Sequence, residues 1–183
     1  MRWLLSGIAS ALVLSGAAYI AGIRINHSPS MPEGLWHVTK LTEAARLGDM
    51  VLICPEEPIA HRYLGAGTCK SGSEPMLKPV AATAGDMVSV SAAGIAVNGE
   101  LLPHTSAKTR DGAGRPLQPF AVGEYKVGAG ELWAVAPHDW SYDSRYLGPI
   151  PALWLIAKAS PVLLWGYHDK EGDTWQTSLQ LRF

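Results

Sequence analysis

Ser30 and Lys78 are the two residues of this chain whose types and settings suggest chemistry together. Ser30 stands in the segment Ser-Pro-Ser-Met-Pro-Glu-Gly (28–34), seven residues after a long apolar run ends at Ile23. A serine hydroxyl is a weak nucleophile until a neighbouring base removes its proton. A neutral lysine amine can take the place that histidine fills in a catalytic triad. The pair could therefore support nucleophilic attack on a peptide carbonyl.

Lys78 can act as a base only if the protein lowers its pKa. A solvated lysine has a pKa near 10.4 and is protonated at pH 7. Burial disfavours the ammonium form and lowers the pKa. The neighbours of Lys78 in the sequence carry no charge: Met76, Leu77, Pro79 and Val80. We therefore expect Lys78 to be buried, because a solvated Lys78 would leave the mechanism without a base.

A third segment, Ser141 to Pro149, completes a set that resembles a known family. The three segments resemble, in order and wording, the bacterial type I signal peptidases. That family has a Ser-Met box, a Lys-Arg-Val…Gly-Asp box and a Ser-x-Asp-Ser-Arg-x-x-Gly box. The wording Ser-Met-Pro-x-Gly-Leu-aromatic is still more similar to the conjugative-transfer branch, the TraF-type peptidases. The resemblance implies that Ser30 is the nucleophile and Lys78 the general base.

The resemblance also implies supporting roles around this dyad. The Ser28 hydroxyl and the Ser30 amide would form the oxyanion hole. Asp143 would pair with Arg145 or another cation, and Ser144 would hydrogen-bond the lysine ammonium, so that the third segment orders the site. The alternatives are that Ser28 is only a turn residue beside Pro29, and that the third segment is a charged surface turn.

The sequence departs from the family pattern around the same residues. The arginine that usually follows the lysine is absent, as are an inner glycine and proline. The nucleophile box is one residue shorter than the common Ser-Met-x-Pro form. Within it, Pro32 and Gly34 would shape the loop, with the glycine allowing close approach of a substrate backbone. These departures keep both dyad residues and weaken the case for a general signal peptidase.

The apolar run from Trp3 to Ile23 has no charged residue and the length of a bilayer core. Residues 1–24 are therefore expected to be a retained, single-pass membrane anchor, with residues 25–183 forming the peptidase domain. A cleavable signal peptide is the alternative, because small residues within the run (Ala17, Ala18 and Ala21) offer weak cleavage sites. Arg2 and Arg24 leave the orientation poorly determined. The substrate class and the cysteines favour a domain in the periplasm, on the bacterial inner membrane.

The cysteines, the net charge and the histidines bear on disulfide formation, nucleic-acid binding and metal binding. Cys54 and Cys69 would form a disulfide in the periplasm and would be free thiols in the cytosol. The formal net charge of −1 and the lack of a basic tract give no indication of nucleic-acid binding. The six histidines show no metal-ligand spacing and no nucleophile–base pattern. We expect neither a metal nor a cofactor.

Beyond the anchor the chain predicts a mainly β fold of the signal-peptidase barrel or sandwich type. Short apolar segments of β type alternate with turn signals, and Asn98-Gly99 is a strong hairpin signal. We expect strands at 50–53, 87–91, 95–97, 131–136 and 152–157. The repeated Gly-Asp-Met-Val is interpreted as a turn that opens a strand. Residues 42–47 are the one further helix candidate, and residues 104–123 should form an exposed loop. Four tryptophans should be core or membrane-interface residues: Trp133, Trp140, Trp154 and Trp165.

The resulting functional hypothesis is a membrane-anchored serine endopeptidase with a Ser30–Lys78 dyad. The resemblance implies a membrane-targeted precursor as substrate, such as a pilin of a conjugation or type IV secretion system. Some members of that branch also join the new ends into a ring, and the sequence does not distinguish this from hydrolysis. Membrane lipid and the precursor polypeptide are the expected partners. The alternatives are a general type I signal peptidase and an inactive assembly factor of a secretion apparatus.

Overall fold

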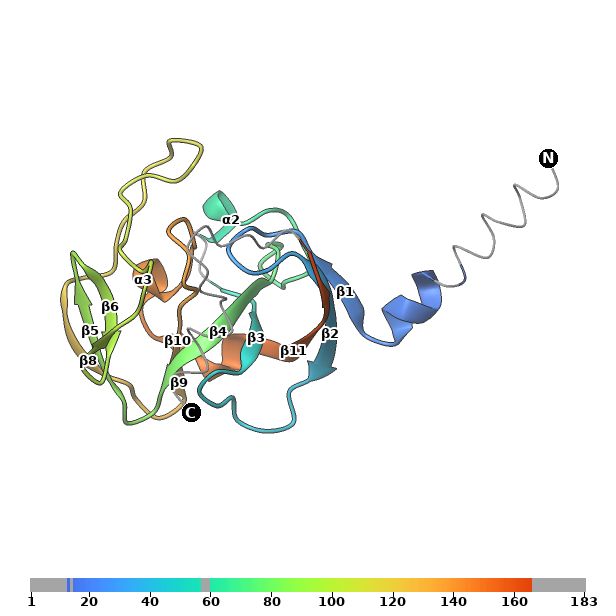
Figure 1. Ribbon diagram of the computed structural model, residues 1–183, viewed down its shortest axis with the longest axis horizontal. Coiled ribbons are helices and arrows are strands. Elements are labelled where there is room, and N and C mark those ends of the chain that lie inside the picture. The colour runs from blue at the N-terminus through green and yellow to red at the C-terminus, as the bar shows by residue number, and fades with distance from the viewer. Residues whose placement is uncertain (1–12, 14, 57–59, 166–183) are drawn as a thin grey trace.

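The computed structural model describes residues 13, 15–56 and 60–165 and shows a mainly β chain built from two antiparallel sheets (Figure 1). The larger, seven-stranded sheet has the order β1-β2-β11-β3-β4-β9-β10. Its strands are β1 (Ile23–Asn26), β2 (Gly34–Lys40), β11 (Leu155–Leu164), β3 (Met50–Ile53), β4 (Met76–Thr83), β9 (Glu131–Ala134) and β10 (Ile150–Pro151). The prediction of a mainly β fold is confirmed.

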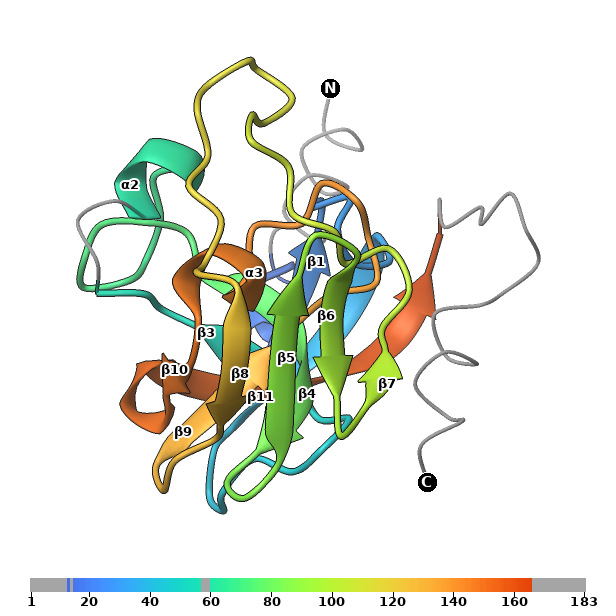
Figure 2. The ribbon, with the colours of Figure 1, turned by 90° about the vertical axis from the view of Figure 1, so that its left-hand side faces the viewer.

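The smaller, four-stranded sheet has the order β7-β6-β5-β8 and faces the viewer in Figure 2. Its strands are β5 (Met87–Ser91), β6 (Gly94–Val97), β7 (Glu100–Leu101) and β8 (Gly123–Lys126). Its buried valines and isoleucine pack against Ala81 and Ala82 of β4 and against Trp133 of β9. The two sheets thus share one hydrophobic cluster, and β4 takes part in it while also carrying Lys78.

Two turn predictions are confirmed. Asn98 and Gly99 both have positive φ, 50° and 86°, and connect β6 to β7 as an Asn-Gly hairpin requires. The two Gly-Asp-Met-Val segments are turns in front of β3 and β5. In each, the aspartate carboxylate accepts the backbone N–H three residues earlier: Asp49 from Arg46 and Asp86 from Thr83.

Three of the local predictions are wrong or need new boundaries. Residues 42–47 form a loop rather than a helix, although Ala45 packs against a core cluster, because a helix of so few residues is costly to nucleate. The first half of the predicted strand 152–157 is a 3-10 helix, Ala152–Trp154, and β11 begins at Leu155. The predicted strand 131–136 ends at Ala134, because the Ala136 N–H donates to the Asp143 carboxylate instead of to a strand.

Two short helices lie beyond the N-terminal segment: α2 (Ala60–Tyr63) and α3 (Ser144–Leu147). Residues 104–123 form the long excursion above the four-stranded sheet in Figure 2, as predicted, although Thr105 within it is buried. Of the four tryptophans, Trp133 is fully buried, Trp154 packs partly against a core cluster, and Trp140 and Trp165 are exposed.

The disulfide between Cys54 and Cys69 is present, with a Cα–Cα distance of 5.4 Å. It links the end of β3 to the segment in front of β4. The bridge therefore restrains the long connection between β3 and β4, the strand that carries Lys78.

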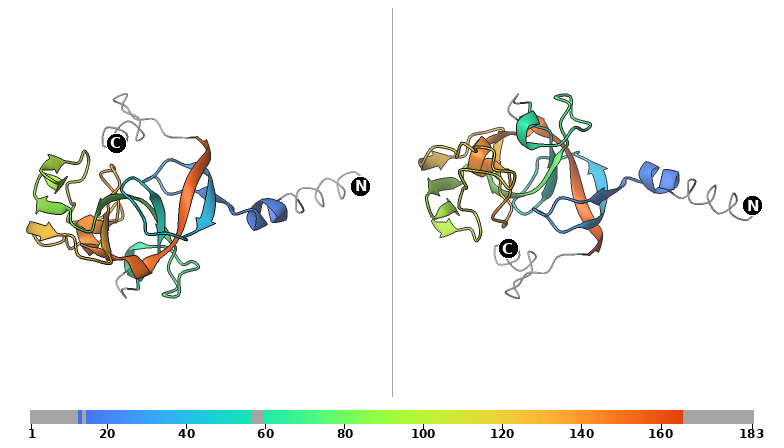
Figure 3. Two further views of the ribbon diagram at one scale, coloured as in Figure 1. Left: turned by 90° about the horizontal axis from the view of Figure 1, so that it is seen from below. Right: turned by 90° about the horizontal axis from the view of Figure 1, so that it is seen from above.

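Residues 15–22, in blue, project away from both sheets before β1 begins (Figure 3). Most of the predicted anchor, residues 1–12 and 14, lies outside the described residues. Within the described part of the chain, no helix reaches the length and apolar character needed to cross a membrane. The end of the apolar run joins the sheet, since Ile23 and Arg24 pair with His37 and Trp36 of β2.

Candidate active site

Ser30 lies in the loop between β1 and β2. Met31 anchors this loop to the core, because its side chain is 2% exposed and packs with Trp36 and Met50 in a core cluster. Ser30 itself is half-buried, and the Ser28 and Ser30 hydroxyl oxygens lie 3.0 Å apart. Burial of the neighbouring methionine therefore places the Ser30 hydroxyl at the protein surface on an anchored loop.

Gly34 closes this loop at the start of β2, and its role differs from the one expected. A Cβ at Gly34 would lie 2.2 Å from the carbonyl oxygen of Leu163 in β11, and the residue has a φ of 156°. The glycine thus allows close approach of a strand of the same chain, where the sequence suggested the backbone of a substrate.

Lys78 lies in β4, directly opposite Val51 of the neighbouring strand β3. It is 4% exposed, so the expectation of burial agrees with its place in the structure. Its Nζ donates a hydrogen bond to the Ser30 hydroxyl oxygen over 2.6 Å. The core of the larger sheet and the β1–β2 loop therefore bring a buried amine and a half-buried hydroxyl into direct contact.

Burial lowers the pKa of Lys78 from 10.5 to about 8. Desolvation of the ammonium is the largest cause. The negative charge of Asp143 acts in the opposite direction, and the positive charge of Arg145 adds to the lowering. The amine is thus neutral in about a tenth of molecules at pH 7, far more than for a solvated lysine, and a neutral amine can accept a proton.

Asp143 and Arg145 form a fully buried ion pair beside the amine. The Arg145 Nε lies 2.8 Å from one carboxylate oxygen of Asp143, and an Nη donates to the other over 3.1 Å. The remaining Arg145 donors reach the carbonyl oxygens of Ala136, His138 and His104. The pair is therefore satisfied on all sides, which excludes the surface-turn alternative for these two residues.

No hydrogen bond joins Ser144 to Lys78 within the described residues. Its buried hydroxyl accepts a hydrogen bond from the Ala134 N–H over 2.9 Å, which ties α3 to the end of β9. The expected hydrogen bond to the lysine ammonium is therefore wrong. The reason lies in α3: with Asp143 as its N-cap, the helix turns Ser144 toward the strand.

The chain is similar to known proteins over most of its length. The family model of signal peptidase, peptidase S26, matches residues 2–165. The chain belongs to this family. The protein described as "Probable conjugal transfer protein TraF" from Sinorhizobium fredii is 40% identical over 172 residues, covering 87% of this chain and 89% of the relative. A "Plasmid transfer protein TraF" from Escherichia coli is 34% identical over 171 residues, or 90% and 96% of the two chains.

A further relative agrees with this assignment. A "Conjugal transfer protein TraF" from Agrobacterium fabrum is 39% identical over 165 residues, covering 85% of this chain and 92% of the relative. A solved signal peptidase I from Enterococcus faecalis V583 aligns over 63% of this chain and 97% of its own, with a TM-score of 0.36 and 14% identity. That likeness is too low to add to the family assignment.

Two residues near the dyad of this S26 family member, Asn26 and His138, were not predicted from the sequence. The side chain of Asn26, at the end of β1, makes hydrogen bonds on both sides of Ser30. His138 is half-buried, and its pKa is lowered first by desolvation and then by the charge of Lys78. An asparagine shortly before Pro29 is a turn signal that could have indicated Asn26, whereas no local pattern indicates His138.

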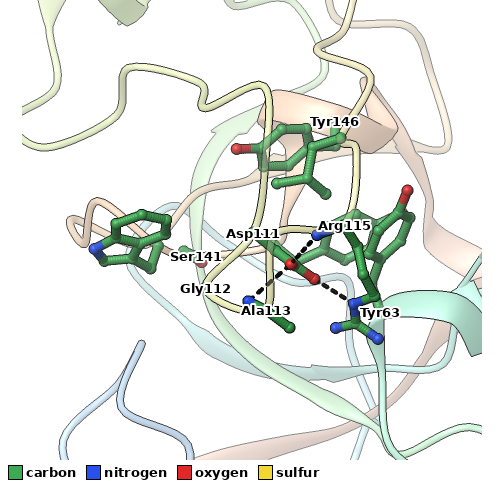
Figure 4. Close-up of a pocket in the computed structure, with 10 residues that line it drawn as sticks. Tyr63, Asp111, Gly112, Ala113, Arg115, Ser141 and Tyr146 are labelled. Carbon is green, nitrogen blue, oxygen red and sulfur yellow. Dashed lines mark hydrogen bonds and ion pairs between the residues drawn. The ribbon is translucent and has the colours of Figure 1, made fainter.

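A pocket of about 300 Å³ lies against the same segment that carries the buried ion pair (Figure 4). It is lined by Tyr63 of α2, by the Asp111–Arg115 ion pair of the long loop, and by residues 140–142 with Tyr146. The Ser141 hydroxyl at this pocket is buried and has no hydrogen-bond partner within the described part of the chain. No group of His, Cys, Asp and Glu side chains among the described residues could hold a metal ion.

Proposed function

We propose that this S26 family member is a serine endopeptidase in which Ser30 is the nucleophile and Lys78 the general base. The observation that carries the proposal is the 2.6 Å contact between Lys78 Nζ and Ser30 Oγ, made by a lysine that is 4% exposed and whose pKa is lowered to about 8. A dyad needs both features, because the base must touch the hydroxyl and must be able to give up its own proton.

The chemistry follows from these positions. Neutral Lys78 accepts the proton of the Ser30 hydroxyl while Ser30 Oγ bonds to the carbonyl carbon of the scissile peptide. The Lys78 ammonium then gives that proton to the leaving amine as the C–N bond breaks. The acyl-enzyme is resolved either by water, which completes hydrolysis, or by an amine of the bound polypeptide, which forms a new peptide bond.

The supporting groups act on charge that develops during this reaction. The Ser28 hydroxyl is 3.0 Å from the Ser30 hydroxyl, within reach of the position of a carbonyl oxygen bound over Ser30. Loss of one oxyanion donor typically lowers kcat by roughly 100-fold. Asp143 stabilises the Lys78 ammonium, and Arg145 offsets part of that attraction, so the pKa of Lys78 stays low enough for it to return to the neutral form.

The proposed substrate is a membrane-targeted precursor polypeptide, such as a conjugative pilin, and not a nucleic acid. The names of the relatives, conjugal and plasmid transfer proteins, support this choice. We place the peptidase domain in the periplasm, held by residues 1–24 at the inner membrane lipid. The Cys54–Cys69 disulfide supports an oxidising compartment.

The test uses cells that carry a tagged candidate pilin and wild-type, Ser30→Ala or Lys78→Ala enzyme. Both variants should leave the precursor untrimmed. Lys158→Ala is the matched control. Val51 of β3 has Lys78 of β4 as its neighbour on one side and Lys158 of β11 on the other, and Lys158 pairs with Asp49. Trimming that persists in both dyad variants would show that the peptidase proposal is wrong.

The same cells separate the remaining alternatives. Rescue of a conditional signal-peptidase mutant would favour a general signal peptidase over a dedicated one. The intact mass of the trimmed product distinguishes a linear chain from a ring, since the ring lacks one water.

A further inference from the structure

Asn26 ends β1 and pairs with Gly34 at the start of β2, so these two residues form the base of the loop that carries Ser30. A loop of seven residues between them, 27–33, could hold Ser30 in many positions. The strand pair fixes only the two ends of that loop. Contacts made by the loop residues, in addition to the burial of Met31, must therefore decide where the hydroxyl lies.

The Asn26 side chain supplies four such contacts. Its Nδ2 donates to the carbonyl oxygens of Ser28 at 3.2 Å, Met31 at 3.1 Å and Pro32 at 3.0 Å. Its Oδ1 accepts the Ser28 N–H at 3.2 Å. The two hydrogens on Nδ2 are shared among three carbonyls, and the acceptor contact fixes which way the amide faces. One side chain thus ties together the residues on both sides of Ser30.

The backbone N–H of Ser30 is not used by this network. Within residues 13, 15–56 and 60–165, none of the loop hydrogen bonds takes Ser30 N–H as its donor. An oxyanion donor must be free in this way, because it has to bind a substrate oxygen. The Asn26 contacts leave that donor available while they hold the neighbouring carbonyls.

We propose that Asn26 is a positioning residue for the dyad. This inference rests on the proposed function of Ser30 and Lys78. Its amide holds loop 27–33 so that the Ser30 hydroxyl stays in contact with Lys78 and the Ser30 N–H stays available. A displacement of about 1 Å at a reacting atom can lower a rate by roughly 100-fold. Asn26 therefore acts on kcat through Ser30, without touching the substrate.

The test compares Asn26→Ala and Asn26→Asp with a control at a second asparagine. Asn98 also holds a turn through both amide atoms, donating to Asp86 and accepting the Met87 N–H, and lies between β6 and β7 of the four-stranded sheet. Because Asn98 has a φ of 50°, Asn98→Gly removes its side chain without backbone strain. The measurements are kcat, KM and Tm for full-length enzyme with a peptide that spans the cleavage site of the precursor.

Asn26→Ala should lower kcat by roughly 10- to 100-fold, with KM within about twofold and a loss of Tm similar to that of Asn98→Gly. Asn98→Gly should keep its kcat. Asn26→Asp should be at least as impaired as Asn26→Ala, because its carboxylate would face three carbonyl oxygens. If Asn26→Ala lowers Tm but keeps kcat per folded molecule, Asn26 only stabilises the turn and the proposal is overturned.

A structural measurement keeps the result separate from the peptidase proposal. The nuclear Overhauser effect between the Ser30 β protons and the Lys78 ε protons should be strong in the wild-type protein and in Asn98→Gly, and weak in Asn26→Ala. An unchanged effect in Asn26→Ala overturns the role of Asn26, even if the wild-type protein cleaves no peptide. Absence of cleavage by wild type with a weakened effect in the variant would instead refute the proposed function alone.

Discussion

Lys78 donates a 2.6 Å hydrogen bond to Ser30, a residue 48 positions earlier in the chain. The lysine comes from β4, which lies between β3 and β9 in the larger sheet. The serine comes from a loop anchored by the burial of Met31. The contact therefore joins an interior strand to an edge loop, and both must be in place before either residue can do chemistry.

The pH dependence of peptide cleavage should follow the titration of Lys78. Only the neutral amine can accept the Ser30 proton, and the pKa of Lys78 is about 8 instead of 10.5. We expect kcat/KM to rise about tenfold per pH unit below pH 8 and to level off above it. Ser28→Ala should lower the rate by roughly 100-fold without moving the midpoint. A midpoint near 10.5 would mean that Lys78 is solvated.

Replacing the buried lysine should stabilise the fold at low pH. Below pH 8 Lys78 is charged in both states and the full cost of burying it is present. Between pH 8 and 10.5 the unfolded chain holds the proton and the folded one does not, so wild-type stability rises with pH. Lys78→Met should raise the free energy of unfolding by about 3 kcal/mol at pH 6, the cost that corresponds to this pKa shift.

Urea titrations at several pH values measure this gain, which should shrink as the pH approaches 10.5. Lys158→Met is the control, since Lys158 is partly exposed and paired with Asp49. A gain for Lys78→Met that does not change with pH would contradict the assigned cause.

Ser144 and Ser141 offer a matched pair of buried hydroxyls. Ser144 accepts the buried Ala134 N–H, whereas the Ser141 hydroxyl has no partner within the described residues. Ser144→Ala leaves a buried donor unpaired and should cost about 1–3 kcal/mol, while Ser141→Ala should change stability by less than about 0.5 kcal/mol. Chemical denaturation of both variants tests the difference, and equal losses would contradict the hydrogen-bond assignment.

Reduction of the Cys54–Cys69 disulfide should destabilise the domain by about 3 kcal/mol, as expected for a loop of 15 residues. The double variant with alanine at both positions should show the same loss without reductant. Thermal unfolding with and without dithiothreitol measures the effect. A reductant-sensitive Tm in the double variant would show that the reductant acts elsewhere.

The sequence alone determined the local features of this protein. The Asn98-Gly99 hairpin, the two Gly-Asp turns and the short apolar strands follow from backbone preferences and side-chain patterns of a few neighbouring residues. The ordered motifs around Ser30, Lys78 and Asp143 indicated the family. Each of these is readable because its information lies within about ten residues of chain.

The tertiary structure decided how the motif residues meet. The partner of Ser144 is a strand N–H, the neighbour of Gly34 is the Leu163 carbonyl, and the segment 42–47 packs Ala45 against the core as a loop. The burial that lowers the pKa of Lys78 and the hydrogen bonds of Asn26 also depend on the folded chain. Desolvation and contact are properties of residues brought together from distant segments, so no local pattern in the sequence could specify them.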